Sequence, residues 1–402
     1  MPLMFSEEQP VTTSLDVPRV AMVCDLLQEN WPSMDLVGDM LLRHLRQGHA
    51  CSFGVERLRP EYSRHLVRLS RVPLRPADTA ERALNRFVRY PQWLSRQKEN
   101  FDLFHVVDHS YAHLVHSLPA DRTVVTCHDT DAFRCLLEPG QSLALRIRRS
   151  ITKRVLSGLQ MAAAVVCDSG ATAGELLAHS WAQPERIHVI SLGVSPVYSP
   201  EADDHADRQI EQLLGPASGR ICILHVGSTI PRKRIDILLQ IFAAVKKQSS
   251  AAMLVRVGGP LTADQQVLAS KLGVESSIIS LPFLTEQMLA ALYRKSALLL
   301  LPSEREGFGL PLLEAMSCGL PVVASDIPAL REVGGNAARY SPVADVESFS
   351  RHIVDLIHIA QTDPRTMQQN REACLTQARQ FSWERCARET AEVYEKVLRE
   401  LP

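Results

Sequence analysis

The chain has 402 residues, of which 46% are hydrophobic and 22% charged, and its formal net charge is −1. This globular composition excludes a mainly disordered chain and gives no overall signature of nucleic-acid binding. No apolar run approaches the ~18–20 residues of a membrane span, and the start lacks the basic and apolar regions of a signal peptide. We therefore expect a cytoplasmic protein of two domains whose nine scattered cysteines are reduced and mostly buried.

Short apolar runs alternate with helical patterns through the first half of the chain. The expected strands are Val20–Asp25, His49–Val55, Leu103–Asp108, Thr123–His128, Ala163–Asp168 and Ile187–Leu192. The clearest helices are Asp35–Gln47, Leu143–Leu156 and Ala171–His179. Alternation of this kind predicts a parallel sheet covered by helices on both faces.

The same alternation restarts after a polar stretch, Ser199–Arg220, which we interpret as a linker. The expected strands of the second half are Ile221–Val226, Met253–Val257, Ile278–Leu281, Leu298–Leu301 and Val322–Ser325. Helices are expected at Ile235–Lys247, Ala263–Leu272, Glu286–Lys295 and Leu310–Cys318, and the pattern is wholly helical after Asp345. We predict an α/β protein of two Rossmann-like doubly wound domains, 1–200 and 201–380, that face a cleft, with a C-terminal helix, 381–402, packing back on the first domain.

The densest motif is LPSEREGFGLPLLEAMSCGLPVVAS, from Leu301 to Ser325. A strand ends, a glycine loop follows Glu306, and a helix begins near Leu310 with a proline in its first turn. Free N–H groups and the positive end of the helix dipole suit a pyrophosphate there. Glu306 and Glu314 can face one cleft, although a carboxylate near a helix start can also be a simple dipole or capping partner.

This motif closely resembles the donor-binding signature of family-4 retaining glycosyltransferases of the GT-B fold. The resemblance implies that Glu306 lies beside the transferred sugar and that Glu314 binds the ribose hydroxyls of a nucleotide. It also implies that backbone amides of the loop hold the donor diphosphate. Those amides belong to Gly307, Phe308, Gly309 and Leu310.

A second motif, HVGSTIPRKR, follows the first strand of the second domain. Gly227 permits a tight turn, and three cations precede the next helix. Such a turn can be ordinary surface, but it resembles the Gly-x-x-x-Pro-Arg-Lys turn of many family-4 enzymes. The resemblance implies that Arg232 and Lys233 grip the diphosphate, Arg as a fork and Lys as a point charge. Many relatives carry Arg directly after the glycine, where Ser228 stands here, and Arg234 replaces a more usual Asn or Gly and receives no role.

His128 ends a strand in TVVTCHDTDAF. It can be a polar surface or capping residue, but family relatives have a similar turn whose His reaches the donor sugar or its acceptor. Asp129 and Asp131 are neighbours that can instead cap the next helix. The family's glycine-rich loop after the first strand is poorly represented, because the residues that follow Asp25 contain no glycine until Gly38.

We expect neither a metal site nor a cofactor besides the donor substrate. Asp203 and Asp204 lie in the linker and form no strand-end Asp-x-Asp, and no His/Cys cluster has zinc spacing. The leaving diphosphate would then be neutralised by Arg232, Lys233 and a helix end, which suits metal-independent chemistry.

The resemblance implies a retaining glycosyltransferase that moves a hexose, mannose in first place, to a sugar or lipid-linked glycan acceptor in polysaccharide assembly. We expect GDP-mannose as donor ahead of a UDP-hexose. A non-catalytic nucleotide-sugar-binding protein and a GT-B-fold epimerase or phosphorylase stay open as alternatives. A nicotinamide-dependent dehydrogenase is disfavoured because no GxGxxG follows any expected strand.

Positive charge is concentrated in the first domain, since Leu41–Gln160 carries 20 Lys and Arg against 11 Asp and Glu. One helical pattern there carries Arg146, Arg148, Arg149, Lys153 and Arg154 beside Leu143, Leu145, Ile147, Ile151 and Leu156. Further arginines recur at positions 64, 68, 71 and 75. The helix is either a solvated face or a surface that docks peripherally on an anionic inner membrane face.

Overall fold

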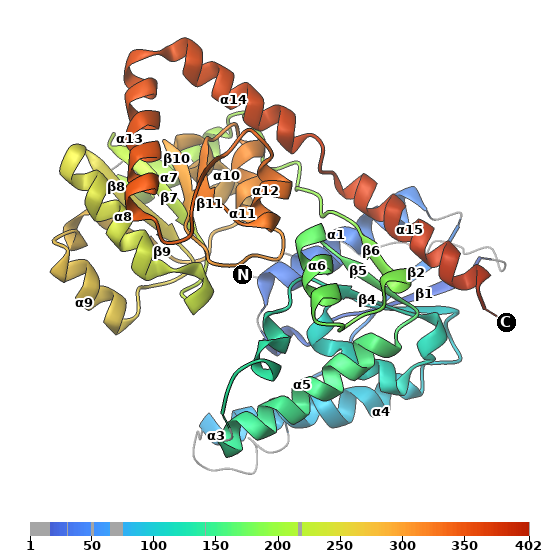
Figure 1. Cartoon of the computed structure of the whole chain (residues 1–402). Coiled ribbons are helices and arrows are strands. Elements are labelled where there is room, and N and C mark those ends of the chain that lie inside the picture. The colour runs from blue at the N-terminus through green and yellow to red at the C-terminus, as the bar shows by residue number, and fades with distance from the viewer. Residues whose placement is uncertain are drawn as a thin grey trace.

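A computed structural model describes residues 17–29, 31–49, 52–64, 75–140, 142–215 and 219–401. Two lobes face each other, and each is built on a six-stranded parallel sheet (Figure 1). Helices lie on both faces of each sheet, as the near-continuous apolar strands require. The prediction of two Rossmann-like doubly wound domains is confirmed.

The N-terminal sheet has the strand order β2-β1-β3-β4-β5-β6. Its strands are β1 (Arg19–Val23), β2 (Gly54–Leu58), β3 (Leu103–Val106), β4 (Thr123–Cys127), β5 (Ala164–Cys167) and β6 (Ile187–Val189). Its helices are α1 (Pro32–Gly48), α3 (Arg75–Leu84), α4 (Tyr90–Ser95), α5 (Leu143–Met161) and α6 (Gly170–Ala178). The strand order reverses between β1 and β3, where ligands of open α/β sheets usually bind.

The C-terminal sheet has the order β12-β11-β10-β7-β8-β9, so its reversal lies between β7 and β10. Its strands are β7 (Ile221–Val226), β8 (Ala252–Val257), β9 (Ile278–Leu281), β10 (Leu298–Leu301), β11 (Val322–Ser325) and β12 (Arg339–Ser341). Its helices are α7 (Asp204–Leu214), α8 (Ile235–Gln248), α9 (Ala263–Lys271), α10 (Glu286–Lys295), α11 (Leu310–Ser317) and α12 (Pro328–Gly334). The sequence pattern missed β12, because its residues, Arg-Tyr-Ser, form no apolar run.

Two sequence predictions are wrong in detail. The strand expected at His49–Val55 is instead β2, since α1 runs to Gly48 and β2 pairs with β1 from Gly54 onward. The expected linker contains α7, which the Asp203 side chain caps at its N-terminus. Three buried residues spaced by four, Ala206, Ile210 and Leu214, give this otherwise polar stretch one apolar face, which packs on α10.

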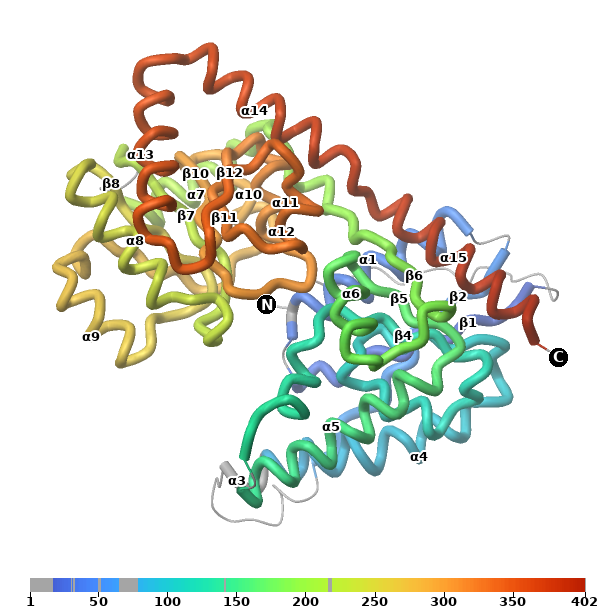
Figure 2. The backbone as a smooth tube through the Cα atoms, in the orientation of Figure 1, coloured from blue at the N-terminus to red at the C-terminus, as the bar shows by residue number. Residues whose placement is uncertain are grey.

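Three helices complete the chain: α13 (Val346–Thr362), α14 (Pro364–Ala378) and α15 (Trp383–Arg399). Figure 2 shows the chain crossing from the C-terminal lobe through α14 to α15, which lies along the N-terminal lobe and packs on α1. The buried Tyr394 hydroxyl of α15 lies 2.6 Å from Nδ1 of His105 in β3. The last helix is therefore part of the N-terminal core.

Among the described residues, none of the helices combines the length and the apolar character that crossing a membrane requires. The eight cysteines in the described ranges are all buried and free of disulfides. This confirms the expectation of buried cysteines for those positions.

Candidate functional site

The cationic turn lies at the carboxyl end of β7, beside the reversal of strand order. A Cβ atom on Gly227 would come within 3.3 Å of the His225 ring and 3.6 Å of the Lys233 side chain, so the turn is closely packed. Lys233 is only 9% exposed. The interpretation of this turn as ordinary surface is therefore wrong for Lys233, because its stem packs against the glycine.

Arg234 adopts a left-handed conformation, with φ +48°, at the residue that precedes α8. Asn and Gly tolerate this region better than other residues, which explains why they would be the usual occupants. The Arg234 side chain forms a local pair with Asp236, at 2.8 Å, and does not join the other two cations.

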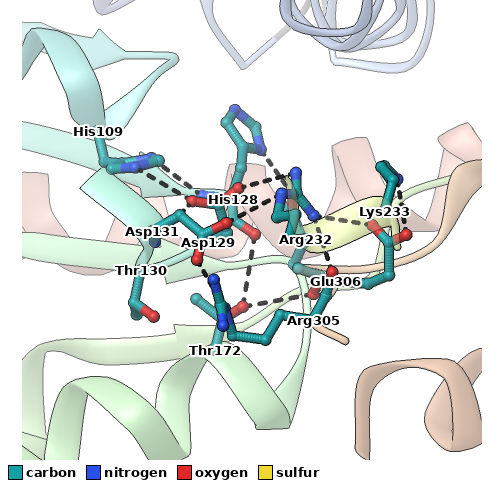
Figure 3. Close-up of polar contacts among 12 residues, drawn as sticks. His109, His128, Asp129, Thr130, Asp131, Thr172, Arg232, Lys233, Arg305 and Glu306 are labelled. Atoms are coloured by element: carbon teal, nitrogen blue, oxygen red, sulfur yellow. Dashed lines mark hydrogen bonds and ion pairs between the residues drawn. The ribbon is translucent and has the colours of Figure 1, made fainter. Parts of the chain in front are cut away.

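Glu306 lies in the loop after β10, on the other side of the same reversal, and it receives both cations. Lys233 Nζ donates to Glu306 Oε1 at 2.6 Å, and Arg232 Nη1 donates to Glu306 Oε2 at 3.0 Å (Figure 3). Burial raises the pKa of Glu306, but Lys233 and Arg232 lower it by more, so the net direction is down and the carboxylate is ionised. The structure brings together the three residues that two separate motifs predicted.

The glycine loop is held where it meets the other lobe. A Cβ atom on Gly307 would lie 1.8 Å from the carbonyl oxygen of His128, so only glycine fits there. The Ser169 hydroxyl donates to the Gly307 carbonyl at 2.6 Å. Gly309, with φ +108°, ends the loop and starts α11. Pro311 has no N–H, and the N–H groups of Leu312 and Leu313 donate to the Gly309 carbonyl, so the Leu310 N–H is the donor that this first turn can offer to a ligand.

Phe308 contributes its side chain to the core, where its ring stacks edge-on against Phe381 with a centroid distance of 5.8 Å. Glu314, in the second turn of α11, does not contact Glu306. It accepts a hydrogen bond from the Tyr293 hydroxyl at 2.8 Å, and burial raises its pKa to about 7. The two glutamates therefore stand in opposite electrostatic environments.

His128 is turned into the N-terminal lobe, which differs from the expectation that its ring reaches into the cleft. Nδ1 lies 2.6 Å from Asp168 Oδ2 and Nε2 lies 2.7 Å from the Val107 carbonyl, so both ring nitrogens are occupied. Burial lowers the pKa of His128, but Asp168 and Asp108 raise it to about 10. The ring is thus a buried imidazolium that orders the turn after β4. The main-chain carbonyl of His128 faces Gly307.

Residues of both lobes join in an ionic network that sequence reasoning missed. Arg232 Nε lies 2.9 Å from Asp131 Oδ2, and Arg232 Nη2 lies 3.5 Å from Asp129 Oδ2. Arg305 Nε donates to Asp131 at 3.0 Å (Figure 3). The sequence offered Asp129 and Asp131 only as possible caps, because the partners lie more than a hundred residues away.

A second contact across the lobes involves the start of α6. The carboxylate of Glu332, on α12, accepts hydrogen bonds from the backbone N–H groups of Gly170 and Ala171 at 2.8 and 2.7 Å. These groups are free donors at the positive end of a helix, which favours a carboxylate. No sequence motif identified Glu332, since its partner is backbone.

A small cavity lies beside this network, between the lobes. It is lined by Thr130, Asp131, Ala171, Thr172, Glu175, Arg232, Arg305 and Glu306. Both signs of charge line it, and in the described ranges no group of three His, Cys, Asp or Glu side chains could hold a metal ion. An anion that enters here meets Arg232 and Arg305, which are paired with Glu306 and Asp131 in this structure.

Comparison with known proteins agrees with this geometry. The family described as Glycosyltransferase Family 4 matches residues 37–198, and the family described as Glycosyl transferases group 1 matches residues 207–373. Together the matches cover most of the chain. The chain belongs to the family-4 glycosyltransferases of the GT-B fold.

Individual glycosyltransferases show the same relationship. The O-antigen chain mannosyltransferase B of Escherichia coli is 29% identical over 277 residues, 68% of this chain and 70% of that protein. The serotype-specific mannosyltransferase WbdA of Escherichia coli is 30% identical over 72% of this chain, which spans only 36% of WbdA. The crystal structure of HepE from Anabaena in complex with UDP and glucose superposes with a TM-score of 0.67 at 16% identity, covering 94% of this chain and 99% of that one.

Proposed function

We propose that this glycosyltransferase transfers a hexose, mannose in first place, from a nucleoside-diphosphate sugar to a glycan or lipid-linked glycan, with retention of anomeric configuration. The observation that carries the proposal is the pairing of Arg232 and Lys233 with Glu306 at the strand-order reversal of the C-terminal sheet. Mannose is favoured because the similar Escherichia coli proteins are named mannosyltransferases. The UDP complex of HepE keeps UDP-hexoses as the second choice.

In this mechanism the two cations stabilise the charge that develops on the β-phosphate as the sugar leaves. Arg232 and Lys233 are buried or nearly so, and a charge partner in such a site acts far more strongly than in water. The diphosphate would replace carboxylates around Arg232, and the Leu310 N–H at the start of α11 would add a backbone donor. Glu306 then orients the sugar without a covalent bond, and the departing phosphate oxygen accepts the proton of the attacking hydroxyl.

Assay with a panel of nucleotide sugars tests this proposal. We expect release of a nucleoside diphosphate with GDP-mannose ahead of UDP-hexoses, and a product with the anomeric configuration of the donor. Donor hydrolysis or transfer with inversion would contradict the retaining mechanism. Binding without turnover of any donor would favour a nucleotide-sugar-binding protein, and interconversion of the sugar without release of the nucleoside diphosphate would favour an epimerase.

We also propose that the transfer needs no metal ion, because Arg232 and Lys233 supply the positive charge that a metal supplies elsewhere. Turnover should persist in EDTA at the untreated rate. Loss of turnover in EDTA that Mg²⁺ or Mn²⁺ restores would contradict this part of the proposal.

The acceptor is proposed to be reached at an anionic membrane surface through α5, which lies along one edge of the N-terminal lobe in Figure 2. Three side chains spaced by four, Leu143, Ile147 and Ile151, are 72%, 54% and 43% exposed on this helix. Exposed basic residues flank them: Arg146, Arg148, Lys153 and Arg154. The expected arginines at 68 and 71, and the side chain of Arg75, lie outside the described residues.

An apolar stripe beside basic residues suits a headgroup region, and each cation near it contributes ~1 kcal/mol. Flotation should show binding to anionic vesicles at low salt and release at high salt. Ile147→Glu should abolish that binding, and a matched Val267→Glu change on exposed α9 should not. Absence of vesicle binding would leave a soluble acceptor.

A further inference from the structure

Arg256, in β8, is a fully buried cation without a counter-charge. Its relative exposure is 0%, and no carboxylate in the described ranges lies within 4.0 Å of it. Nη1 donates to the Gly259 carbonyl at 3.3 Å and Nη2 to the Gly227 carbonyl at 3.4 Å, and Nε has no partner. Only backbone carbonyls therefore oppose this charge.

This arrangement is unfavourable for the free protein. Buried charges are normally paired, and burial alone lowers the pKa of Arg256 below its ordinary value. Arg294 of the same lobe shows the usual solution, since its Nη2 lies 2.8 Å from Asp207. An apolar residue at 256 would fit the buried strand without the electrostatic penalty, so the charge needs another explanation.

The position of Arg256 supplies that explanation. Arg256 binds the carbonyl of Gly227, and Gly227 begins the closely packed turn that contains Lys233. A Cβ atom on Gly258 would lie 2.3 Å from the same carbonyl. Arg256, the two glycine turns and Lys233 thus form one packed unit behind the cationic turn. His225 lies in this unit with neither ring nitrogen bonded, and burial, Arg256 and Lys233 hold its pKa far below the ordinary value. His225 is therefore neutral and provides no counter-charge for Arg256.

We propose that Arg256 is a positioning residue for a bound diphosphate. It fixes the Gly227 and Gly259 turns through their carbonyls, and its charge joins those of Arg232 and Lys233 beneath the bound anion. The diphosphate supplies the counter-charge that the free protein lacks. This inference rests on the proposed function and extends it, since it adds a third cation from a strand that no motif singled out.

Calorimetry with GDP, UDP, guanosine and uridine separates charge from shape. Arg256→Met should weaken diphosphate binding by about tenfold or more, the scale of one charged hydrogen-bonding group, and leave nucleoside binding within about twofold. Arg256→Lys should recover much of the loss. Arg294→Met, the matched control, should leave the ratio of diphosphate to nucleoside affinity unchanged.

Thermal unfolding of the ligand-free proteins gives an independent readout. Arg256→Met should unfold at the wild-type temperature or higher, because replacing a buried charge with an apolar side chain is often neutral or stabilising. Arg294→Met should unfold at a lower temperature, because it leaves Asp207 unpaired.

Two results overturn the inference. One is an equal loss of diphosphate and nucleoside affinity in Arg256→Met together with a lower unfolding temperature, which is the signature of a merely structural residue. The other is an unchanged preference for the diphosphate. With either result, the donor proposal still stands if the wild-type protein binds GDP or UDP. If the wild-type protein binds neither nucleotide, the donor proposal and this inference are both overturned.

Discussion

The two sheets carry different charged side chains at equivalent points, namely where the strand order reverses. Each sheet reverses its strand order once, between β1 and β3 in the N-terminal lobe and between β7 and β10 in the C-terminal lobe. The first reversal carries two buried carboxyl groups, Asp25 and Asp108. The second carries the Gly227 turn with Lys233, and across from it Glu306.

The difference is one of charge balance. Burial and the neighbouring Asp108 raise the pKa of Asp25 to about 9, so Asp25 is protonated at neutral pH. Burial also raises the pKa of Asp108, but His109 and His128 lower it by more, and the net direction is down. The charges of the N-terminal edge are thus balanced within that lobe, by protonation of Asp25 and by the histidines beside Asp108. The cations of the C-terminal edge are paired with Glu306, and our proposal is that an anionic donor replaces part of that pairing. Similar topology therefore does not give similar sites, because the residues that follow the strands determine the charge of each site.

The largest expected effect is at the N-terminal edge and concerns stability. Asp108→Asn should lower the free energy of unfolding by about 3–5 kcal/mol, because it removes the charge opposite His109 and His128. Asp25→Asn is the matched control and should change it by no more than about 1 kcal/mol, because the amide resembles the carboxyl group that is already neutral. Urea unfolding at pH 7 measures both, and equal losses would remove the asymmetry between the two carboxyl groups.

At the C-terminal edge, Lys233→Ala should lower turnover by roughly 10²–10³, the scale of one lost transition-state charge partner. Some stability should be lost as well, since Lys233 is buried and pairs with Glu306. Arg234→Gly serves as control, because it removes an adjacent cation and relieves a left-handed residue, and should leave turnover unchanged. Steady-state kinetics on folded variants measures both changes, and near-normal turnover in Lys233→Ala would contradict the role proposed for Lys233.

A pH titration sharpens the contrast between the two glutamates. The pKa of Glu314 is raised to about 7, so the folded protein holds this proton between pH 4.5 and 7 while the unfolded chain has released it. Its contribution to stability is complete below about 4.5 and disappears as pH rises through 7, for a total of about 3 kcal/mol. Unfolding measured from pH 4.5 to 8 should show this fall in wild type and a flatter profile in Glu314→Gln. Parallel profiles would contradict it.

The smallest expected effect concerns the ionic network between the lobes. Asp131→Asn frees Arg232 and Arg305 from a partly exposed carboxylate, and pairs of this kind contribute about 0.5–1 kcal/mol. The KM for the donor should therefore fall by about two- to fivefold. Asp236→Asn, which releases only Arg234, should not change it. A higher KM in Asp131→Asn would mean that Asp131 helps to bind the donor.

Local sequence determined most elements and the parts of the proposed donor site that lie within one lobe. Apolar runs gave ten of the eleven expected strands close to their observed places, because a strand buried on both faces must be apolar. The glycine loop and the Pro-Arg-Lys turn were also visible, since each is a continuous stretch whose backbone geometry restricts which residues fit.

Contacts between distant residues were decided by the tertiary structure alone. His128 was identified by sequence, but the direction of its ring depends on Asp168 and a carbonyl after β3, which only the sheet brings near. The pairing of Arg232 with Asp131 depends on how the two lobes meet.

Arg256 shows the limit most clearly. In the sequence Arg256 is one charged residue in an apolar run, and the sequence does not indicate whether the fold places a carboxylate next to it. Burial removes the water that would solvate the charge, and among the described residues folding brings two glycine carbonyls, and no carboxylate, to replace it. Local sequence restricts backbone shape, but the balance of charge at a buried point is a sum over everything that the fold brings there, and only the assembled structure contains that sum.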